Sequence, residues 1–521
     1  MATIRIKTRD GVEERQAEAG ARLDDLILSA GIVLDRPCGG RGTCGKCRVQ
    51  ASGGLTPPTA AEKKLLADGL RAGWRLACQA RLAGDAQVEV GAEVIFFDKT
   101  FFTAGVEREP GPLGLAVDLG TTTVAALAAG FESGRVYSGN AVLNRQAAHG
   151  AEVMSRLLYA ERAPDELRRL AWESVREAAS GLPLGAAERS RVTRAVVVGN
   201  SAMHHLALGR PVATLLRSPF MPGDTGLAEA PLAELTGLFP ALERLVFAPL
   251  IGGFVGADAL ACLLYFGLSG EGEPALALDL GTNGEIMLSA GGRVWVASAA
   301  AGPAFEGVNI SCGMRAVPGA VTRVAWAGES RPGGRSHKWE LTTVGGAEPA
   351  GLAGSGLLSA ARALREIGGI DASGRIDEGA PGFERAAGGK QVRLHPRVVL
   401  TQNDVRELQK AKGAVRAGVE SLIERAGIGP DALARVILTG SFGGRLDPAD
   451  MLALGVLPEL PPARLYSIPN GAGLGAALML RDEELRRAEE LAARAEHVEL
   501  NLAPGFMDTY VARMALGNDL R

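Results

Sequence analysis

The sequence predicts a mixed α/β protein built from several domains. Two observations carry this prediction: four cysteines gather in the first 80 residues, and a strand–carboxylate–Gly-Thr pattern occurs twice further along the chain. At roughly 150 residues per domain, 521 residues correspond to about three or four domains. Hydrophobic residues make up 47% and charged residues 22%, close to a globular average, which excludes a chain that is mainly disordered.

Charge and hydropathy predict a soluble, cytoplasmic protein without a nucleic-acid or membrane partner. The net charge is −3 and no strongly basic block occurs, which argues against an anionic partner surface. Residues 1–10 alternate apolar and charged side chains and lack the apolar core of a signal peptide. The apolar stretch 250–266 contains Asp258 and is shorter than the ~20 residues of a membrane span, so we expect a buried helix there.

The N-terminal cysteines predict a metal centre. The candidate ligands are Cys38, Cys44, Cys47 and Cys78. An iron–sulfur cluster needs four thiolates around a small inorganic core, and three ligands so close in sequence require the backbone to curl around it. The glycines at positions 39, 40, 42 and 45 can adopt the positive φ that such a loop needs and turn amide N–H groups toward sulfur. Zinc is the alternative, although zinc sites usually pair two short Cys-x-x-Cys segments and the fourth cysteine here stands alone.

This cysteine run resembles the [2Fe–2S] ferredoxins. The five residues between Cys38 and Cys44 are similar to the adrenodoxin-like and bacterial branch, and the Arg-Leu-Ala-Cys-Gln context of Cys78 matches the same family. The resemblance implies a ubiquitin-like α+β ferredoxin domain over residues 1–94, which the strand-like and helix-like segments 4–7, 23–30 and 86–90 suit. Residues 95–112 end in a proline- and glycine-rich stretch, and we expect them to be a linker.

An internal duplication organises the rest of the chain. Asp118 and Asp279 each end an apolar strand, and a Gly-Thr turn into a second strand follows each of them. Such a turn offers backbone N–H and hydroxyl donors to phosphate oxygens, and the carboxylate can hold Mg²⁺ directly or through water. The turn residues are Gly120, Thr121 and Thr122 in the first copy and Gly281, Thr282 and Asn283 in the second. One copy occurs by chance in ordinary hairpins, whereas two copies in matching contexts predict a phosphate-binding pair.

A second pair of motifs supports the duplication. Residues 195–201 and 436–444 are both apolar strands that end in glycine and a small polar residue, which lets a ligand approach the backbone closely. The later motif contains Gly440, Ser441 and Gly443. A further turn of small residues contains Gly354 and Gly356, and we expect it to pack beside a nucleoside. Residues 470–477 predict a helix whose glycine and alanine surface permits close packing.

These motifs resemble the superfamily of actin, sugar kinases and heat-shock chaperones, in which two lobes of ribonuclease-H-like topology clamp a nucleotide. The resemblance implies lobe I over residues 113–270 and lobe II over residues 271–521, with a C-terminal helix returning toward lobe I. It assigns both Gly-Thr turns to phosphate binding, Asp118 and Asp279 to catalysis with ATP and Mg²⁺, and the glycine motif around Ser441 to adenosine. The catalytic base is not identifiable from the sequence, and Glu285 and Glu306 are candidates by their proximity to the motifs.

A redox cluster fused to an ATP clamp suggests electron transfer coupled to nucleotide hydrolysis. The fusion, together with residues 150–156, 199–203 and 401–413, resembles the reductive activators of corrinoid proteins. Those proteins return inactive Co(II) corrinoid to Co(I) at the expense of ATP. The resemblance implies an enzyme that passes one electron from its [2Fe–2S] cluster to the corrinoid protein of a methyltransferase or O-demethylase system. It also implies an upstream low-potential electron donor, and we include a homodimer among the expectations.

Several alternatives stay open at this point. A small-molecule kinase with a ferredoxin appendage would need a polar pocket between the lobes, which residues 302–313 could line or, equally, close as a structural turn. A binding module or chaperone could use the nucleotide only as a switch. The activators of 2-hydroxyacyl-CoA dehydratases carry a cysteine in a loop that would fall at residues 298–302, where this chain has none. The remaining candidates, Cys262, Cys312 and the pair His204–His205, are expected to be ordinary buried or helical residues.

Overall fold

The structure is a computed structural model of the chain. It describes residues 2–8, 11–29, 42, 45, 47–90, 110–150, 152–281, 283–307, 309–329, 337–386, 388–440 and 446–518. They belong to two compact units, the first of residues 1–94 with 143–174 and the second of residues 95–142 with 175–521.

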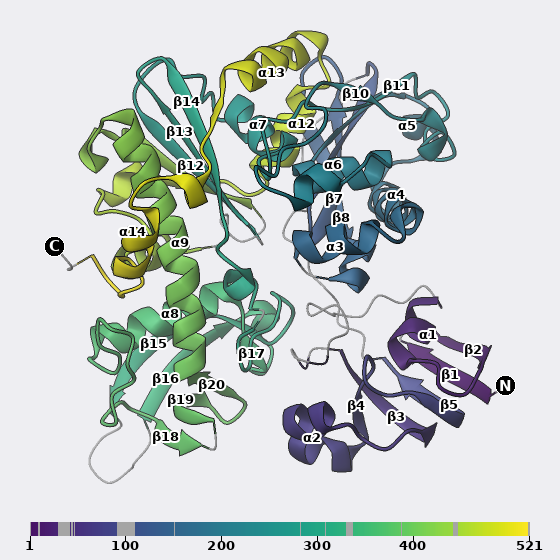
Figure 1. Ribbon diagram of the computed structural model, residues 1–521, viewed down its shortest axis with the longest axis vertical. Helices are drawn as coiled ribbons and strands as arrows, with labels where there is room; N and C mark the ends of the chain where they lie inside the picture. Colours follow the sequence, from purple (N-terminus) through teal and green to yellow (C-terminus); the bar gives the residue numbers. More distant parts are fainter. Residues whose placement is uncertain are drawn as a thin grey trace. The chain divides into compact units, whose positions relative to one another are not determined.

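The N-terminal part of the first unit is a five-stranded mixed sheet with strand order β2-β1-β5-β3-β4 (Figure 1). Its elements are β1 (Ala2–Thr8), β2 (Gly11–Ala17), α1 (Leu23–Ser29), β3 (Arg48–Leu55), α2 (Ala60–Leu66), β4 (Trp74–Leu76) and β5 (Leu82–Glu89). β1 pairs with β5 in parallel and with β2 antiparallel. Ile4, Ile6 and Val88 are fully buried on one face, as the two-residue period of a strand requires. The ubiquitin-like arrangement predicted for this region is confirmed.

An ion pair inside this domain ties α2 to β4, the strand that leads to Cys78. Glu62 accepts hydrogen bonds from Arg75 Nε at 2.8 Å and from the backbone N–H of Leu76 at 3.1 Å. The same carboxylate closes a capping box with Thr59 at the start of α2. Burial raises the pKa of Glu62, but the hydrogen bonds from Arg75 and the backbone outweigh it and the net shift is downward. The charged pair therefore fixes the segment that carries the last cysteine.

The second unit contains two six-stranded sheets with the same core topology (Figure 1). In the first, β6 lies antiparallel to β7 and parallel to β9; in the second, β12 lies antiparallel to β13 and parallel to β21. The first sheet comprises β6 (Leu113–Leu119), β7 (Thr123–Gly130), β8 (Val136–Leu143), β9 (Val192–Val198), β10 (Ala228–Glu229) and β11 (Arg244–Phe247). The second comprises β12 (Ala275–Leu280), β13 (Gly284–Ala290), β14 (Arg293–Ala299), β21 (Arg435–Thr439), β22 (Leu465–Ser467) and β23 (Glu496–His497). This repeat of strand order confirms the predicted duplication and the two-lobed ribonuclease-H-like fold.

Helices follow the strands of the first sheet and connect it to the second. They are α3 (Val153–Ala160), α4 (Pro164–Ser180), α5 (Ala186–Arg189), α6 (Ser201–Leu208) and α7 (Ala257–Tyr265). The helix expected in the apolar stretch 250–266 is therefore confirmed as α7, and it packs against α12 (Gly471–Leu478). A Cβ at Gly475 would lie 2.0 Å from the carbonyl oxygen of Ala261, so the close helix packing predicted from the glycines and alanines of this segment is confirmed.

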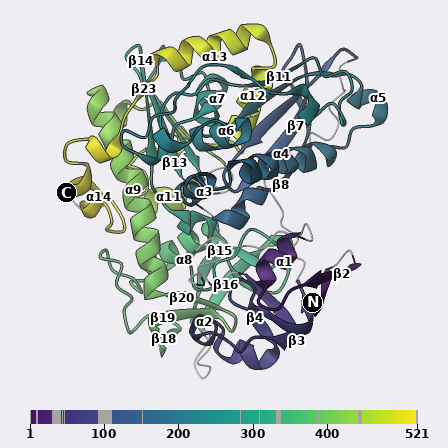
Figure 2. The same cartoon turned by 45° about the vertical axis from the view of Figure 1, so that its right-hand side comes forward.

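Between β14 and β21 the chain adds two three-stranded sheets and two helices. The sheets contain β15 (Ala320–Glu329), β16 (His337–Thr343) and β17 (Gly351–Leu352), and β18 (Phe383–Ala386), β19 (Gly389–His395) and β20 (Val398–Thr401). The helices are α8 (Gly354–Glu366) and α9 (Gln402–Ala426), which runs beside β13 and β14 in both Figure 1 and Figure 2. After β21 come α11 (Pro448–Ala453), α12, α13 (Asp482–Arg494) and α14 (Phe506–Ala512).

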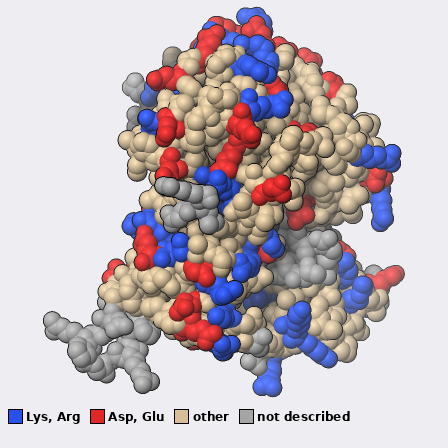
Figure 3. Space-filling view, turned by 60° about the vertical axis from the view of Figure 1, so that its left-hand side comes forward, with Lys and Arg blue, Asp and Glu red and all other residues tan. Residues whose placement is uncertain are grey.

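The surface carries both signs of charge. Figure 3 shows Lys and Arg side chains interspersed with Asp and Glu over the face that it presents, in line with the near balance of 56 basic and 59 acidic residues. Among the helices in the described ranges, none combines the length and the apolar composition needed to cross a bilayer.

The chain after α14 is held by α9 through an unusual buried lysine. Lys412 is 1% exposed and its Nζ donates hydrogen bonds to the carbonyl oxygens of Arg513, at 2.7 Å, and Ala515. Gln409 Nε2 donates to the carbonyl oxygen of Met514 at 2.9 Å. Burial, together with the nearby Arg416 and Arg513, lowers the pKa of Lys412 to about 7, while Glu420 opposes the shift.

We expect this lysine to make stability rise with pH. Between pH 7 and its ordinary pKa of 10.5, the unfolded chain binds a proton that the folded chain does not, so the free energy of unfolding increases with pH in that window. The Lys412→Met variant should lose this component. The difference in denaturant-unfolding midpoint between wild type and Lys412→Met should therefore change between pH 7 and pH 9. The exposed neighbour Lys410→Met is the control, and a pH-independent difference at Lys412 would contradict the expectation.

Candidate functional site

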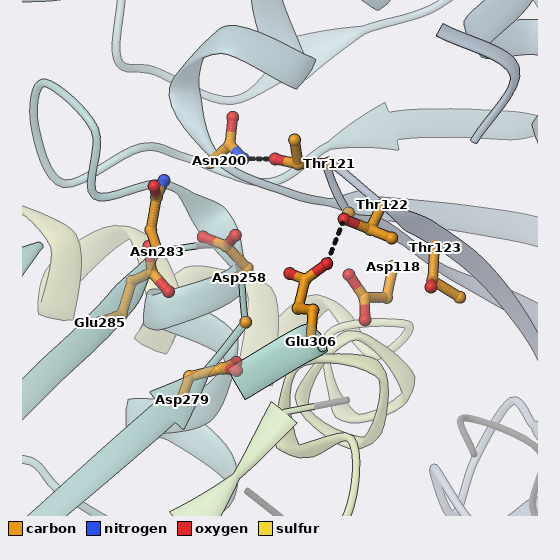
Figure 4. A pocket seen from close by; sticks show the side chains of 12 residues that line it. Asp118, Thr121, Thr122, Thr123, Asn200, Asp258, Asp279, Asn283, Glu285 and Glu306 are labelled. Carbon is orange, nitrogen blue, oxygen red and sulfur yellow. Dashed lines mark hydrogen bonds between the residues drawn. The ribbon is translucent and has the colours of Figure 1, made fainter. Parts of the chain in front are cut away.

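The first strands of the two six-stranded sheets end at one pocket in the second unit. It holds about 490 Å³ of empty space, part of which is open to solvent. Figure 4 shows the side chains that line it. They are Asp118, Gly120, Thr121, Thr122, Thr123, Asn200, Asp258, Asp279, Gly281, Asn283, Glu285 and Glu306. The structure therefore brings together both predicted Asp–Gly–Thr motifs, although they lie about 160 residues apart in the sequence.

Each motif forms a tight turn between antiparallel strands. The N–H of Gly120 donates to the carbonyl oxygen of Thr123 at 3.1 Å, and the N–H of Gly281 donates to that of Asn283 at 3.0 Å. Asp118, at the end of β6, is 2% exposed. Because β6 and β12 have equivalent neighbours in their sheets, both turns reach the same pocket, the first with Asp118 and its threonine hydroxyls and the second with Asp279 and Asn283.

Asn200 connects the first turn to α6. Its side-chain oxygen caps α6 by accepting a hydrogen bond from the N–H of Met203 at 3.0 Å, and its Nδ2 donates to Thr121 Oγ1 at 2.8 Å. A Cβ on the preceding Gly199 would lie 2.5 Å from the carbonyl oxygen of Leu119. From the sequence we expected Gly199 to let a ligand come close to the backbone. In the structure it instead lets the end of β6 come close, which brings α6 to the first turn.

Gly440 has the equivalent place in the second lobe. Its φ is +92°, and a Cβ there would lie 2.1 Å from Asp279 Oδ1. On the other side of this carboxylate, the thiol of Cys262 donates to Asp279 Oδ2 at 3.6 Å. Burial, and the charges of Asp279 and Asp258, raise the pKa of Cys262, so the thiol keeps its proton and acts as a donor. Cys262 is fully buried as expected, but it also touches a site residue.

The pocket is strongly acidic. Its lining carries five carboxylates and, among the described residues, no lysine or arginine. Burial raises the pKa of Glu285 well above its ordinary range, and the charges of Asp258 and Asp279 raise it further. Ser298 Oγ donates to Glu285 Oε1 at 3.4 Å. A polyphosphate entering this pocket requires a cation to offset the repulsion between like charges.

Glu306 crosses from the second lobe to the first. It ends the short 3₁₀ helix η5 (Pro303–Glu306), and Thr122 Oγ1 donates to its Oε2 at 3.3 Å (Figure 4). The segment 302–313, for which the sequence left a pocket wall and a structural turn open, therefore contributes to the wall at this residue.

Other predicted nucleotide residues lie outside the pocket lining or outside the described residues. A Cβ on Gly354 would lie 1.6 Å from the carbonyl oxygen of Phe305, and one on Gly356 would lie 2.0 Å from that of Val321. Both glycines thus pack against backbone of their own lobe, and their contact with a nucleoside stays a prediction. Thr282, Ser441 and Gly443 fall outside the described residues.

The sequence did not assign Asp258, Thr123 or Asn200 to the site. Asp258 is a single carboxylate in an apolar stretch and lies in the first turn of α7. Its position as the one carboxylate in an apolar stretch was the available signal, because a charge that is partly removed from water is costly unless it is paired or has a function. Asn200 belongs to the motif at residues 195–201, and the helix cap that it forms explains its residue type.

Two of the four predicted cluster ligands are described, and both are buried. The N–H of Ala77 donates to the carbonyl oxygen of Cys47 at 2.9 Å, which joins the segments that carry Cys47 and Cys78. Gln79 Nε2 donates to Cys78 Sγ at 3.6 Å. Buried thiols with an amide donor on sulfur fit a thiolate-bound cluster. Cys38 and Cys44 lie outside the described residues.

The loop glycines near these cysteines have the conformation that the sequence predicted. Gly42 has φ +73° and Gly45 has φ +67°, whereas Gly39 and Gly40 lie outside the described residues. A Cβ on Gly42 would lie 2.6 Å from the side chain of Gln79, so Gly42 packs closely on the residue after Cys78.

The remaining candidates behave mostly as structural residues. Cys312 is half-buried and donates to the carbonyl oxygen of Val399 at 2.8 Å. His204 and His205 lie on α6, as expected for helix histidines. Burial lowers the pKa of His204 to about 3, so it is neutral at physiological pH. In the part of the chain that the structure describes, no three His, Cys, Asp or Glu side chains converge to hold a metal ion by themselves.

Comparison with known proteins finds matches along nearly the whole chain. The family model for a 2Fe–2S iron–sulfur cluster binding domain matches residues 7–83. The model for the RACo middle region matches residues 113–271, and the model for the C-terminal domain of RACo, the ASKHA domain, matches residues 273–520. The first match favours iron over the zinc alternative.

Individual relatives are similar to the chain over half of its length or more. The chain is 31% identical over 447 residues to the corrinoid activation enzyme RamQ of Eubacterium limosum, covering 80% of this chain and 73% of that protein. It is 32% identical over 289 residues to the [Co(II) methylated amine-specific corrinoid protein] reductase of Methanosarcina barkeri, covering 52% of this chain and 51% of that protein. A solved reductive activator for corrinoid, iron–sulfur protein covers 98% of both chains, with TM-score 0.69 and 25% identity.

Replacing Cys78, the last of the predicted cluster ligands, tests whether the cluster site and the nucleotide site are separable. We expect Cys78→Ser to lose most of its iron and its visible absorbance after anaerobic reconstitution, because an alcohol is a poor ligand for the cluster. Nucleotide affinity, measured by titration calorimetry, should be unchanged. Cys312→Ser is the control and should keep both properties. Unchanged iron content in Cys78→Ser, or a parallel loss of nucleotide binding, would contradict the assignment.

Proposed function

The chain belongs to the family of reductive activators of corrinoid proteins, and we propose that it uses ATP to return a Co(II) corrinoid protein to the Co(I) state. The observation that carries this proposal is the presence, in one chain, of a cluster-binding domain and a two-lobed pocket built from duplicated Asp–Gly–Thr turns. The corrinoid protein is the substrate and belongs to a methyltransferase or O-demethylase system. This membership sets aside the kinase, the switch module and the dehydratase activators.

We assign electron transfer to the N-terminal domain. When bound, a [2Fe–2S] cluster of ferredoxin type supplies one electron at a potential of about −400 mV. Cys38, Cys44, Cys47 and Cys78 would hold it. Gln79 places an amide donor on Cys78 Sγ and thereby stabilises negative charge on that sulfur. The ion pair of Glu62 with Arg75 keeps the segment of Cys78 in place.

We assign the binding of ATP and Mg²⁺ to the pocket of the second unit. The Gly-Thr turns offer N–H and hydroxyl donors to phosphate oxygens from both lobes. Asp118 and Asp279 would hold Mg²⁺. Carboxylate oxygens are suitable ligands for this ion, which usually keeps several waters and binds through one or two carboxylates together with substrate phosphates. The five carboxylates of the lining therefore support the magnesium complex rather than free ATP as the ligand.

Coupling follows from the position of the pocket between two lobes. An acceptor with a potential about 59 mV below that of its donor costs a factor of ten in the equilibrium constant of a one-electron transfer. A ligand shifts a conformational equilibrium only by its differential affinity for the two states. ATP that contacts the turns of both lobes binds more tightly when these turns are close together. It therefore favours the arrangement in which the two lobes are closed over the pocket. We propose that this arrangement forms the complex in which the unfavourable reduction proceeds.

The proposal includes three further expectations. We expect a low-potential electron donor upstream of the cluster, a cytoplasmic location and a homodimer.

Removing either strand-end carboxylate should abolish ATP hydrolysis. Asp118→Ala and Asp279→Ala each delete a group that we expect to hold Mg²⁺, so hydrolysis at saturating Mg²⁺ should fall to background in a phosphate-release assay. Asp508→Ala, on the exposed side of α14, is the control. Wild-type turnover in both site variants would remove the pocket from the proposed function.

An anaerobic spectroscopic assay tests the function itself. Reduced protein, ATP and a Co(II) corrinoid protein are mixed, and the absorbance of Co(I) is followed. We expect Co(I) to form with ATP and not without it. If no Co(I) forms with any of several corrinoid proteins while ATP is hydrolysed, the corrinoid function is wrong and a metabolite panel should be tested for phosphoryl acceptors.

A further inference from the structure

Glu306 enters the pocket from the second lobe and reaches the first phosphate turn. Its side chain is 5% exposed and accepts a hydrogen bond from Thr122 Oγ1 at 3.3 Å. Figure 4 shows it between Asp118 on one side and Asp258 and Asp279 on the other. A carboxylate in this place is within hydrogen-bond reach of a hydroxyl that we expect to contact a phosphate.

The segment that carries Glu306 is tightly fixed. Phe305 is fully buried in the core of the second lobe, and the N–H of Gly307 donates to the carbonyl oxygen of Ala304 at 3.0 Å. Gly307 has φ +69°, a conformation that L side chains rarely adopt. The chain therefore turns sharply directly after Glu306, which aims this side chain into the pocket.

Glycines of the following loops pack directly on this segment. At Gly354, the first residue of α8, a Cβ would lie 1.6 Å from the carbonyl oxygen of Phe305. At Gly313, a Cβ would lie 2.0 Å from the carbonyl oxygen of Gly307. Both distances are far below a van der Waals contact, so any side chain at these positions must displace the backbone next to Glu306. The small-residue turn of Gly354 thus has a structural role that does not require a nucleoside.

We propose that Glu306 is the catalytic base of ATP hydrolysis, and that Gly354 is a positioning residue that acts through it. This inference rests on the proposed function. Thr122 connects the base to the phosphate turn, so the carboxylate and the γ-phosphate are placed by the same residue. A general base must lie within hydrogen-bond reach of the proton that it takes, and the contact with Thr122 places the carboxylate beside the turn where a water attacking the γ-phosphate would lie.

The proposed step is an in-line hydrolysis. The oxygen of a water molecule forms a bond to the γ-phosphorus while the bond between this phosphorus and the bridging oxygen to the β-phosphate breaks. One proton of the water passes to the Glu306 carboxylate. The products are ADP and inorganic phosphate, and the proton returns to solvent in the next turnover.

The Glu306→Gln variant tests the base. It keeps the size of the side chain and a hydrogen-bond partner for Thr122 but removes the proton acceptor. We expect kcat for ATP hydrolysis to fall by about 10²–10⁴-fold, whereas Kd for ATP changes by less than about threefold. Wild-type kcat should decline at acidic pH as the base is protonated, and this limb of the pH profile should vanish in the variant. Glu378→Gln, an exposed glutamate paired with Arg385, is the matched control.

The Gly354→Ala variant tests the positioning role. We expect kcat to fall by tenfold or more with Kd for ATP retained, and the acidic limb of the pH profile to shift because the surroundings of Glu306 change. Gly429→Ala is the control, since Gly429 has φ −89° and open space around its Cβ position. A loss of ATP affinity with unchanged kcat would instead assign Gly354 to the nucleoside and overturn the positioning role. If Gly354→Ala does not fold, Thr122→Val supplies the second variant and should lower kcat and shift the same limb.

The outcomes separate this inference from the proposed function. If wild type hydrolyses ATP and Glu306→Gln is within a few-fold of it, only the assignment of Glu306 is overturned. If wild type binds ATP without hydrolysing it under any condition, including with a corrinoid protein present, the proposed function and the base both fall. A large loss of kcat together with a lost acidic limb supports the assignment.

Discussion

The second unit depends on one geometric constraint: two Asp–Gly–Thr turns must face each other across a single pocket. Each turn joins the first and second strands of its sheet, and both sheets have the same core topology. Duplication of one strand arrangement therefore supplies one carboxylate from each side, Asp118 and Asp279. The hydrogen bond between Thr122 and Glu306 shows that the lobes come within contact distance at this point. A ligand that spans the pocket is thus in a position to sense, and to change, the relation of the lobes.

Glycine is the means by which backbone segments come this close. The chain has 70 glycines, and those around the pocket allow contacts that no other residue permits. A Cβ on Gly256 would lie 2.2 Å from the carbonyl oxygen of Gly199, which places the start of α7 against the end of β9. Gly440 likewise lets the end of β21 contact Asp279, and Gly354 lets the start of α8 contact the segment that carries Glu306. The glycines at the pocket thus serve the close packing of the protein's own backbone.

Local sequence was sufficient to predict the cysteine centre, the duplicated turns and the lobes. Most of this evidence lies in residues that are close together in the chain, as Asp118 is with its Gly-Thr turn, and Cys78 was assigned from the residues on either side of it. Asp258 could not be assigned in this way, because only the tertiary packing of α7 brings it beside Asp279 and Glu285. The two small sheets inserted before β21 were not predicted either, because residues 320–401 contain no copy of the duplicated strand motifs from which the lobes were inferred. The role of Gly354 emerges only from its distance to Phe305, to which the sequence offers no guide.

The central claim is that ATP turnover in the pocket drives an electron transfer that the cluster domain does not accomplish alone. The most direct test compares wild type with Asp279→Ala, both reconstituted to the same iron content and reduced to the same extent, with ATP and a Co(II) corrinoid protein. We predict that wild type forms Co(I) while the variant, with its cluster intact, leaves the corrinoid as Co(II). Equal formation of Co(I) by both proteins would show that the nucleotide pocket is dispensable for reduction and would contradict this account.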